Sequence, residues 1–160
     1  MHPNVLRVTA ALSAVGADGA ASGVVVLPEP APTAATAAAQ LGCPVGAIAN
    51  SLVFAADGHP VLVLTSGAHR VDTARVAALL GVRRVQRADA DFVRAHTGFP
   101  IGGVAPVGHP HPLRTLVDVA LADHPVVWAA AGHPHTVFPT SFAELLRVTG
   151  GTAAEVGAGG

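Results

Sequence analysis

The chain has 160 residues, 51% of them hydrophobic and 12% charged, which suits one compact domain with its own core and excludes a disordered chain. It contains no lysine and no tyrosine, which excludes chemistry by an amine side chain and argues against extensive stacking of bases on aromatic rings. The formal net charge is −1, so a polyanionic partner needs a local basic patch, and we expect neither DNA nor a membrane as partner. The single cysteine, Cys43, cannot close an internal disulfide, so we expect a cytoplasmic protein.

The first part of the chain predicts two helices separated by a short strand. Apolar residues recur at helical spacing over residues 2–15, and residues 33–41 are rich in alanine and precede a glycine at a C-cap position. Between them, the small residues 16–23 predict a loop. The apolar run 24–27 predicts a buried strand that ends at the prolines after it.

The clearest local signal is a β-hairpin. Two apolar, β-prone runs at residues 48–54 and 60–65 flank Asp57-Gly58, a dipeptide typical of tight turns. Strands this apolar are typical of the centre of a sheet. Asn50 is a polar residue inside the first run, and either a neighbouring backbone group satisfies its amide or it lines a pocket.

Two helices flank a further strand in the middle of the chain. Asp72 is a good N-cap for a helix that ends before Gly81, and Asp89 is suited to cap a second helix that ends at Thr97. The intervening segment 82–87 predicts a basic strand. Its arginines are Arg83, Arg84 and Arg87, and they form either a solvated face or a local basic patch for a polyanionic partner.

The character of the chain changes at residues 99–112, which hold three glycines and four prolines. Neither a helix nor a central strand tolerates this composition, so we expect a loop of defined shape, and long loops inside compact domains are usually functional. Gly102 and Gly103 allow backbone N–H groups to approach a ligand closely. A tight turn that merely needs positive φ is the alternative explanation of the pair.

The C-terminal part mixes strands with short helical segments. We expect strands at 113–117, 126–131, 136–138 and 152–156, a helical turn at 118–122, and a helix to residue 148 that opens with the capping-box pair Ser141 and Glu144. Adjacent strands interspersed with helices predict an α+β (mixed α/β) fold with a mixed sheet. We expect one domain over residues 1–156 and a flexible tail at 157–160.

Four segments occur in an order and spacing that together resemble the YbaK family, which includes the editing insertion of bacterial prolyl-tRNA synthetases. These segments are Ile48-Ala49-Asn50-Ser51-Leu52-Val53-Phe54, Thr65-Ser66-Gly67-Ala68-His69-Arg70-Val71-Asp72, Gly102-Gly103-Val104-Ala105-Pro106-Val107-Gly108 and Trp128-Ala129-Ala130-Ala131-Gly132. Any one of them alone is a weak indication. The chain departs from the family pattern at Asn50, where the family typically has a lysine.

The resemblance implies a curved mixed β-sheet flanked by helices, with a pocket between the first hairpin strand and the glycine-rich loop. It also implies an aminoacyl-tRNA deacylase that hydrolyses the ester of a mischarged aminoacyl-tRNA in trans, with a synthetase as a further candidate partner and with no cofactor. Such an ester is already activated, so the protein needs to place it, admit water and stabilise the oxyanion rather than supply a nucleophile.

On this basis we expect the following residues at the site. Candidate catalytic residues are Asn50, Gly102, Gly103 and His109, with His109 or His133 assisting proton transfer because a histidine titrates near neutral pH. Candidate substrate-binding residues are Ser66, Gly67, Arg70, Pro106, Gly132, His133 and Thr136. Candidate tRNA-binding residues are Arg83, Arg84 and Arg87.

Two alternatives stay open at this point. The loss of the family lysine is compatible with a non-catalytic module that binds tRNA or a small ligand in a degenerate pocket. The two His-Pro-His segments, at 109–111 and 133–135, are compatible with a metal-dependent hydrolase if they meet in space, although no carboxylate stands at ligand spacing beside them. We therefore expect no metal site.

Overall fold

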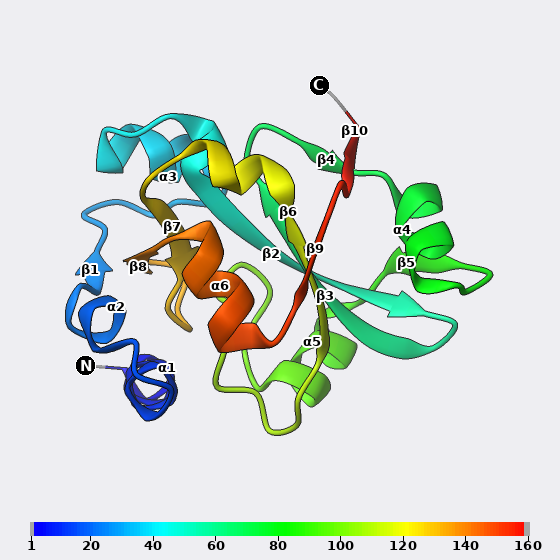
Figure 1. The fold of residues 1–160 in the computed structure, drawn as a ribbon. Helices are drawn as coiled ribbons and strands as arrows, with labels where there is room; N and C mark the ends of the chain where they lie inside the picture. The colour runs from blue at the N-terminus through cyan, green and yellow to red at the C-terminus, as the bar shows by residue number, and fades with distance from the viewer. Residues whose placement is uncertain (1, 159–160) are drawn as a thin grey trace.

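The computed structural model describes residues 2–158, which form a twisted mixed sheet with helices packed around it (Figure 1). The strand order is β1-β8-β7-β2-β3-β6-β9, with β5 paired to β2. The bounds of these strands are β1 Val25–Val26, β2 Ile48–Ala56, β3 His59–Ser66, β5 Val85–Arg87, β6 Arg114–Asp118, β7 Val127–Ala130, β8 Thr136–Thr140 and β9 Thr152–Ala154. The predicted α+β fold with a mixed sheet is confirmed.

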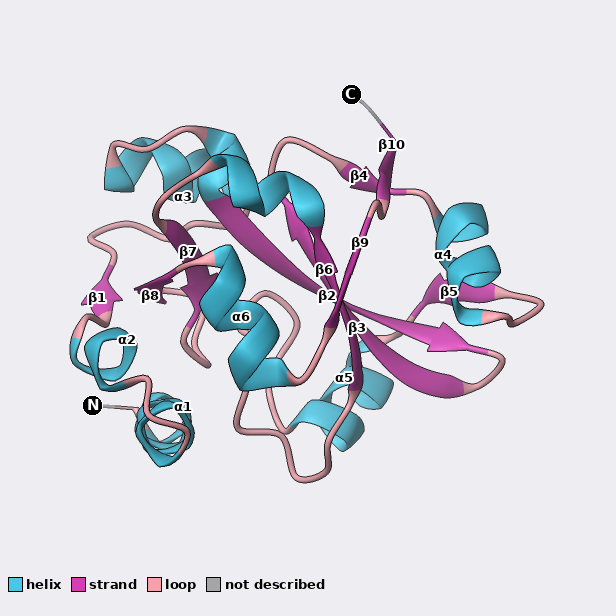
Figure 2. Cartoon of the chain, viewed as in Figure 1, coloured by secondary structure: helices cyan, strands magenta, loops and turns pink. Residues whose placement is uncertain are grey.

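Helices lie around both ends of the sheet and on its faces (Figures 1 and 2). Their bounds are α1 Pro3–Ala14, α2 Asp18–Ser22, α3 Ala34–Leu41, α4 Thr73–Leu80, α5 Ala90–Thr97 and α6 Phe142–Thr149, with short 3-10 turns η1 Val45–Ala47 and η2 Val119–Asp123. None of these helices is both long and apolar enough to cross a membrane.

Strand β2 organises the site because its two edges are paired differently. One edge pairs with β3 in an antiparallel register over residues 49–56. The other edge pairs with β7 at Ile48 and Ala49 and with β5 at residues 54–56. Residues 50–53 therefore lie opposite a gap between β7 and β5.

The two faces of the hairpin bury separate hydrophobic clusters, as the alternation of side chains along a strand requires. Val53, Leu62 and Leu64 belong to one cluster, which also contains Phe99 of the glycine-rich loop. Phe54 and Val63 belong to the other, which α4 covers. The expectation that both hairpin strands are central is confirmed, because each has a strand on either side.

The predicted helix caps are present. Asp72 Oδ1 accepts the backbone N–H of Arg75 at 3.1 Å, and Asp89 Oδ1 accepts that of Phe92 at 2.8 Å. Ser141 Oγ accepts the N–H of Glu144 at 3.1 Å. The capping box there is only half formed, because the Glu144 carboxylate accepts the hydroxyl of the preceding Thr140 at 2.7 Å instead.

The structure differs from the sequence expectations at three places. The run 24–27, expected as a buried strand, forms the two-residue strand β1, and both Val25 and Val26 are exposed because β1 ends the sheet and pairs with β8 alone. Residues 18–22, expected in a loop, form the short helix α2, because the buried Ala20 packs into the hydrophobic cluster that contains Leu62 and Phe99, which we call the main cluster. Gly157–Ala158, expected in a flexible tail, form strand β10, which pairs with β4, Arg70–Val71. A side chain at Gly157 would lie 2.6 Å from Nδ1 of His69, so only glycine fits there. Residues 159 and 160 of the expected tail lie outside the described residues.

Candidate functional site

A cavity of about 260 Å³ opens at the gap beside β2. Its floor is Asn50–Val53 of β2, and its walls are the segment leading into α3, the tip of the glycine-rich loop and the β7–β8 pair. Apolar lining residues include Leu27, Ala31, Ala34, Ile48, Trp128 and Val137. Asn50 and Gly102, which the sequence analysis placed in one pocket, both line this cavity.

The gap leaves backbone groups of β2 without a strand partner. The Ile48 carbonyl accepts the N–H of Gly67 on the β3 side, whereas the Val53 carbonyl accepts the N–H of Ala88 on the opposite side. Since successive residues of a strand direct their N–H and C=O groups to alternate edges, those of Ser51 point to the same edge as those of Val53. The N–H and C=O of Ser51 therefore face the cavity, where no described strand is in register with them.

The Ser51 hydroxyl is buried beside the cavity and also lacks a hydrogen-bond partner. Among the buried side-chain oxygen and nitrogen atoms of residues 2–158, Ser51 Oγ is the one that makes no hydrogen bond. Buried polar atoms in proteins are almost always paired, so an unpaired hydroxyl in a cavity wall indicates a place for water or a ligand. The sequence analysis missed Ser51, although a second polar residue after Asn50 in an otherwise apolar strand was a usable signal.

The two glycines of the loop serve different purposes. Gly102 has φ +87°, and a side chain built on it would meet open space, so its backbone conformation rather than packing requires glycine. Gly103 donates its N–H to the Pro100 carbonyl at 3.0 Å, which closes a turn. A side chain on Gly103 would lie 3.2 Å from Cα of His133, so this position allows close approach of two loops. Both amides were expected to be free to bind a ligand, but the Gly103 amide already donates to a carbonyl of its own loop.

His109 is not among the residues that line this cavity. Its Nε2 donates to the Ala105 carbonyl at 2.7 Å, and its ring packs edge-on against Phe99. With Pro106 it lines a second hollow of about 260 Å³, between the loop, α1 and α6. Burial lowers the pKa of His109, the Ala105 carbonyl raises it in part, and the Arg7 guanidinium lowers it further. The structure therefore separates His109 from Asn50 and Gly102, with which the sequence analysis grouped it.

Ser66 and Gly67 support the floor of the cavity from behind and are not among its lining residues. Ser66 Oγ donates to the Gly46 carbonyl at 3.0 Å, and Ser66 N–H donates to the Asp118 carboxylate at 3.0 Å. A side chain on Gly67 would lie 2.5 Å from the Val45 carbonyl oxygen. Both residues thus fix the turn η1 that leads into β2. Arg70 lies in β4, also away from the lining.

The segment between β7 and β8 flanks the cavity. Thr136 lines it, and its hydroxyl donates to the His133 carbonyl at 3.0 Å. The His133 ring lies between those of His2 and His135 in tilted contacts, with ring centroids 5.0 and 5.3 Å away. Burial and the charges of these two neighbours lower the pKa of His133, which favours its neutral form. Gly132, at φ +98°, packs beneath the start of α1.

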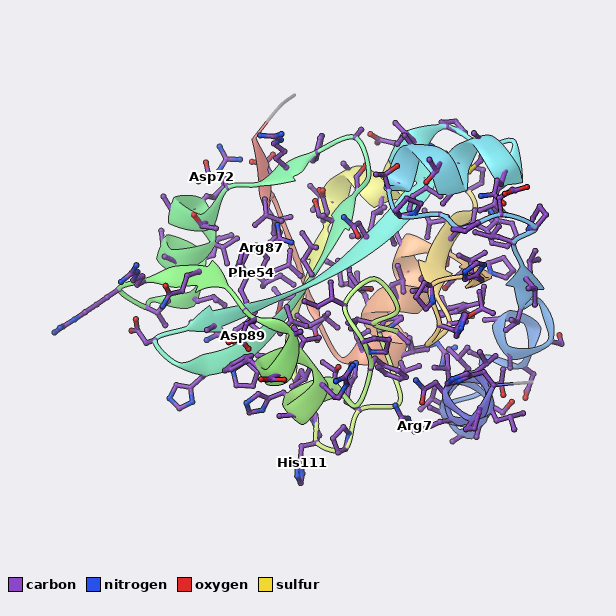
Figure 3. All side chains as sticks on the ribbon, turned by 180° about the vertical axis from the view of Figure 1, so that it is seen from behind. Arg7, Phe54, Asp72, Arg87, Asp89 and His111 are labelled. Carbon is purple, nitrogen blue, oxygen red and sulfur yellow. The ribbon has the colours of Figure 1, made fainter. Side chains whose placement is uncertain are left out.

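The structure separates the three arginines of the predicted tRNA contact. Arg87, at the end of β5, lines the cavity and is the charged residue among its described lining (Figure 3). Arg83 and Arg84 lie before β5, where their backbone N–H groups bind the Asp57 carboxylate at 3.1 and 3.0 Å. These hydrogen bonds, chiefly that of Arg83, lower the pKa of Asp57. All three arginines are exposed, but of the three it is Arg87 that lines the cavity.

Within residues 2–158, no three His, Cys, Asp or Glu side chains are arranged to hold a metal ion. His111 of the first His-Pro-His segment projects outward from the tip of its loop (Figure 3). The rings of His133 and His135 in the second segment are in tilted contact. The His133 Nδ1 accepts the backbone N–H of His135 at 3.2 Å.

Known proteins resemble this chain in sequence and in structure. Residues 28–148 match the sequence model of the aminoacyl-tRNA editing domain. The proline–tRNA ligase of Nitratidesulfovibrio vulgaris is 34% identical over 103 residues, and that of Geobacter sulfurreducens is 31% identical over 123 residues. These matches cover 64% and 71% of this chain but only 18% and 21% of the ligases, so the chain spans about a fifth of these curated relatives.

Several solved structures match nearly the whole chain, among them the following two. One is described as a candidate trans-editing enzyme for prolyl tRNA synthetase, with 40% identity, a TM-score of 0.92 and 99% coverage of both chains. The other is a hypothetical protein with 29% identity, a TM-score of 0.86 and coverage of 95% of this chain and 99% of that one. The family that the four sequence segments resemble is thereby shown, and the chain belongs to the aminoacyl-tRNA editing domain family.

Proposed function

We propose that this protein is a trans-acting deacylase of the cytoplasm, which hydrolyses the ester of a mischarged aminoacyl-tRNA. The observation that carries the proposal is that Asn50, Gly102 and the unpaired groups of Ser51 line one cavity beside a free strand edge. The likeness to proline–tRNA ligases and to a candidate trans-editing enzyme supports tRNA charged in error by a prolyl-tRNA synthetase as the substrate.

In the proposed reaction, the ester carbonyl lies between the Asn50 amide and the turn at Gly102. A water oxygen bonds to the carbonyl carbon, the bond from that carbon to the ribose oxygen breaks, and the ribose oxygen takes up a proton. The products are a free amino acid and an uncharged tRNA. Neutral hydrogen-bond donors aimed at the developing oxyanion suffice for an ester that is already activated.

Other groups at the cavity have supporting roles in this proposal. The backbone N–H and C=O of Ser51 hold the amino-acid part as a short added strand would be held. Arg87 attracts the terminal phosphate, with Arg83 and Arg84 extending this attraction along the acceptor end. The apolar lining accepts a small apolar side chain. His133 is not a lining residue, but it precedes Pro134, which is, and its Cα lies beside Gly103, so it is the candidate to assist the proton transfer in place of His109.

A second candidate function is a binding module without turnover. The specific observation in its favour is Asn50, a neutral residue at the position where the family typically has a lysine. Such a module would retain the cavity and the arginines and would bind tRNA without cleaving the ester.

A deacylation assay with a panel of mischarged tRNAs, with and without a chelator, tests these alternatives. The proposed editor releases the amino acid at a rate that the chelator does not change, whereas binding without release supports the module. Release that the chelator abolishes would instead indicate a metal-dependent hydrolase. Asn50→Ala and Gly102→Ala should each slow release, and the site assignment is wrong if neither does.

A further inference from the structure

We infer that the first helix, α1, positions the glycine-rich loop for catalysis, with Arg7 as a clamp across the base of the loop. This inference rests on the proposed function, since it assigns Arg7 and Asn4 to the same site as positioning residues. Neither residue lies within the segment 28–148 that matches the family model, and neither lines the cavity.

Arg7 contacts the loop at both of its ends. At the start, its Nη2 donates to the Gly98 carbonyl at 3.0 Å, and its Cζ lies 4.4 Å from the centroid of the Phe99 ring. At the end, a side chain built on Gly108 would lie 3.7 Å from the Arg7 Cγ, so the loop returns against the stem of the arginine. Figure 3 shows Arg7 reaching from α1 toward this loop. One side chain therefore joins the two ends of the segment that carries Gly102.

The charge of Arg7 suits this position. Gly98 is the C-cap of α5, where carbonyl groups without a helical partner concentrate negative partial charge. The described residues form one arginine–carboxylate pair, Arg147–Glu144, and one histidine–carboxylate contact, His69–Asp118, and Arg7 takes part in neither. The guanidinium is thus held by a helix end and an aromatic face instead of a carboxylate.

Asn4 extends the same contact to the second loop of the site. Residues 4 and 7 are three apart, so they lie on one face of α1. Asn4 Nδ2 donates to the Gly132 carbonyl at 3.2 Å. A side chain on Gly132 would lie 2.9 Å from the Asn4 carbonyl oxygen and 3.0 Å from Cε1 of Phe99. The fully buried Phe99 therefore joins α1, the glycine-rich loop and the turn before His133 in a single contact.

The mechanical consequence follows from the conformation of the loop. At its tip, Gly102 has positive φ and open space around it, whereas Gly103 packs against His133 and Pro134 of the second loop. The position of the tip therefore depends on the base of its own loop, which Arg7 contacts, and on the second loop, which Asn4 joins to α1. A displacement of about 1 Å at a catalytic group is enough to reduce a rate by up to about a hundredfold.

The test uses Arg7→Ala in the full chain, with Arg75→Ala as a matched control. Arg75 likewise donates from a helix to a carbonyl, that of Gly157, at 3.2 Å, but on α4 and away from the cavity. We expect Arg7→Ala to lower kcat about tenfold or more, to change KM less than about threefold, and to speed amide hydrogen exchange over residues 98–108. Arg75→Ala should leave all three unchanged.

Further variants separate the contributions of the clamp. Arg7→Lys keeps a cation over Phe99 and should restore part of kcat, and Asn4→Ala should speed exchange around Gly132. If Arg7→Ala does not yield folded protein, Arg7→Gln keeps the stem and a donor, and it should still lower kcat. The inference is overturned if Arg7→Ala, or Arg7→Gln in its place, retains kcat and exchange at wild-type values, or if exchange rises evenly along the chain.

Failure of the proposed function gives a different result. A wild-type protein that binds mischarged tRNA without releasing the amino acid refutes the deacylase proposal. In that case local exchange at 98–108, measured in Arg7→Ala against Arg75→Ala, still decides whether Arg7 holds the loop.

Discussion

Replacing Asn50 with lysine should increase the rate of ester hydrolysis. The Asn50 side chain is exposed at the cavity, so a longer cationic side chain fits there without displacing the core. A hydrogen bond from a charged donor contributes roughly 1 kcal/mol more than one from a neutral donor, which corresponds to about a fivefold gain in kcat/KM. Arg87 lines the same cavity, and repulsion between the two like charges makes fivefold an upper value for the gain.

The assay is single-turnover deacylation of a mischarged tRNA by the wild type, Asn50→Lys and Asn50→Gln. Gln lengthens the amide without adding charge, so the difference between Lys and Gln isolates the charge. The advantage of Lys should shrink as salt is raised to about 1 M, where the Debye length is about 3 Å. The reasoning is refuted if Asn50→Lys is no faster than Asn50→Gln, or if its advantage does not depend on salt.

Three further predictions concern the cavity and the two loops around it. Ser51→Ala removes a buried hydroxyl that has no partner, so it should leave the melting temperature unchanged or raise it while slowing deacylation; a lower melting temperature with normal turnover would contradict this assignment. Gly132→Ala should lower the free energy of unfolding by about 2–5 kcal/mol in denaturant titrations, because φ is positive there and the new side chain would lie 2.9 and 3.0 Å from its neighbours. Gly150→Ala, where φ is positive but the space is open, should lower it by only about 1–2 kcal/mol. The lowered pKa of His109 means that the unfolded chain binds protons more readily than the folded one, so its contribution to stability is present above about pH 6.5 and is lost as the pH falls below that value. Thermal unfolding of His109→Gln should therefore depend less on pH in this range than that of the wild type, and equal slopes would show that His109 is not responsible.

Much of the fold could be predicted because its signals act over a few neighbouring residues. The Asp72 and Asp89 caps, the left-handed Gly81 and the Asp57-Gly58 turn each depend on contacts within one turn of chain, and each is present as expected. Helix α2 was missed because short runs of small residues carry no periodic pattern, and only burial of Ala20 against the main cluster selects the helix.

The site was predictable in part. Asn50 and Gly102 were placed together by the order of the family segments, and they do share a cavity. His109 follows the same loop in sequence, yet the left-handed Gly108 before it and the Ala105 carbonyl direct its ring into the other hollow. Proximity along the chain therefore did not establish proximity to the cavity.

By itself, then, the sequence determined the secondary structure around its caps and turns, the mixed character of the sheet and the family. Tertiary structure alone decided that β7 and β5 stop short of each other along β2, which opens the cavity and turns Ser51 toward it. It also decided that Arg7 reaches the glycine-rich loop and that Arg87 parts from Arg83 and Arg84. The physical reason is that strand pairing and packing join segments far apart in the chain, and the length of each pairing depends on the whole sheet rather than on any local pattern.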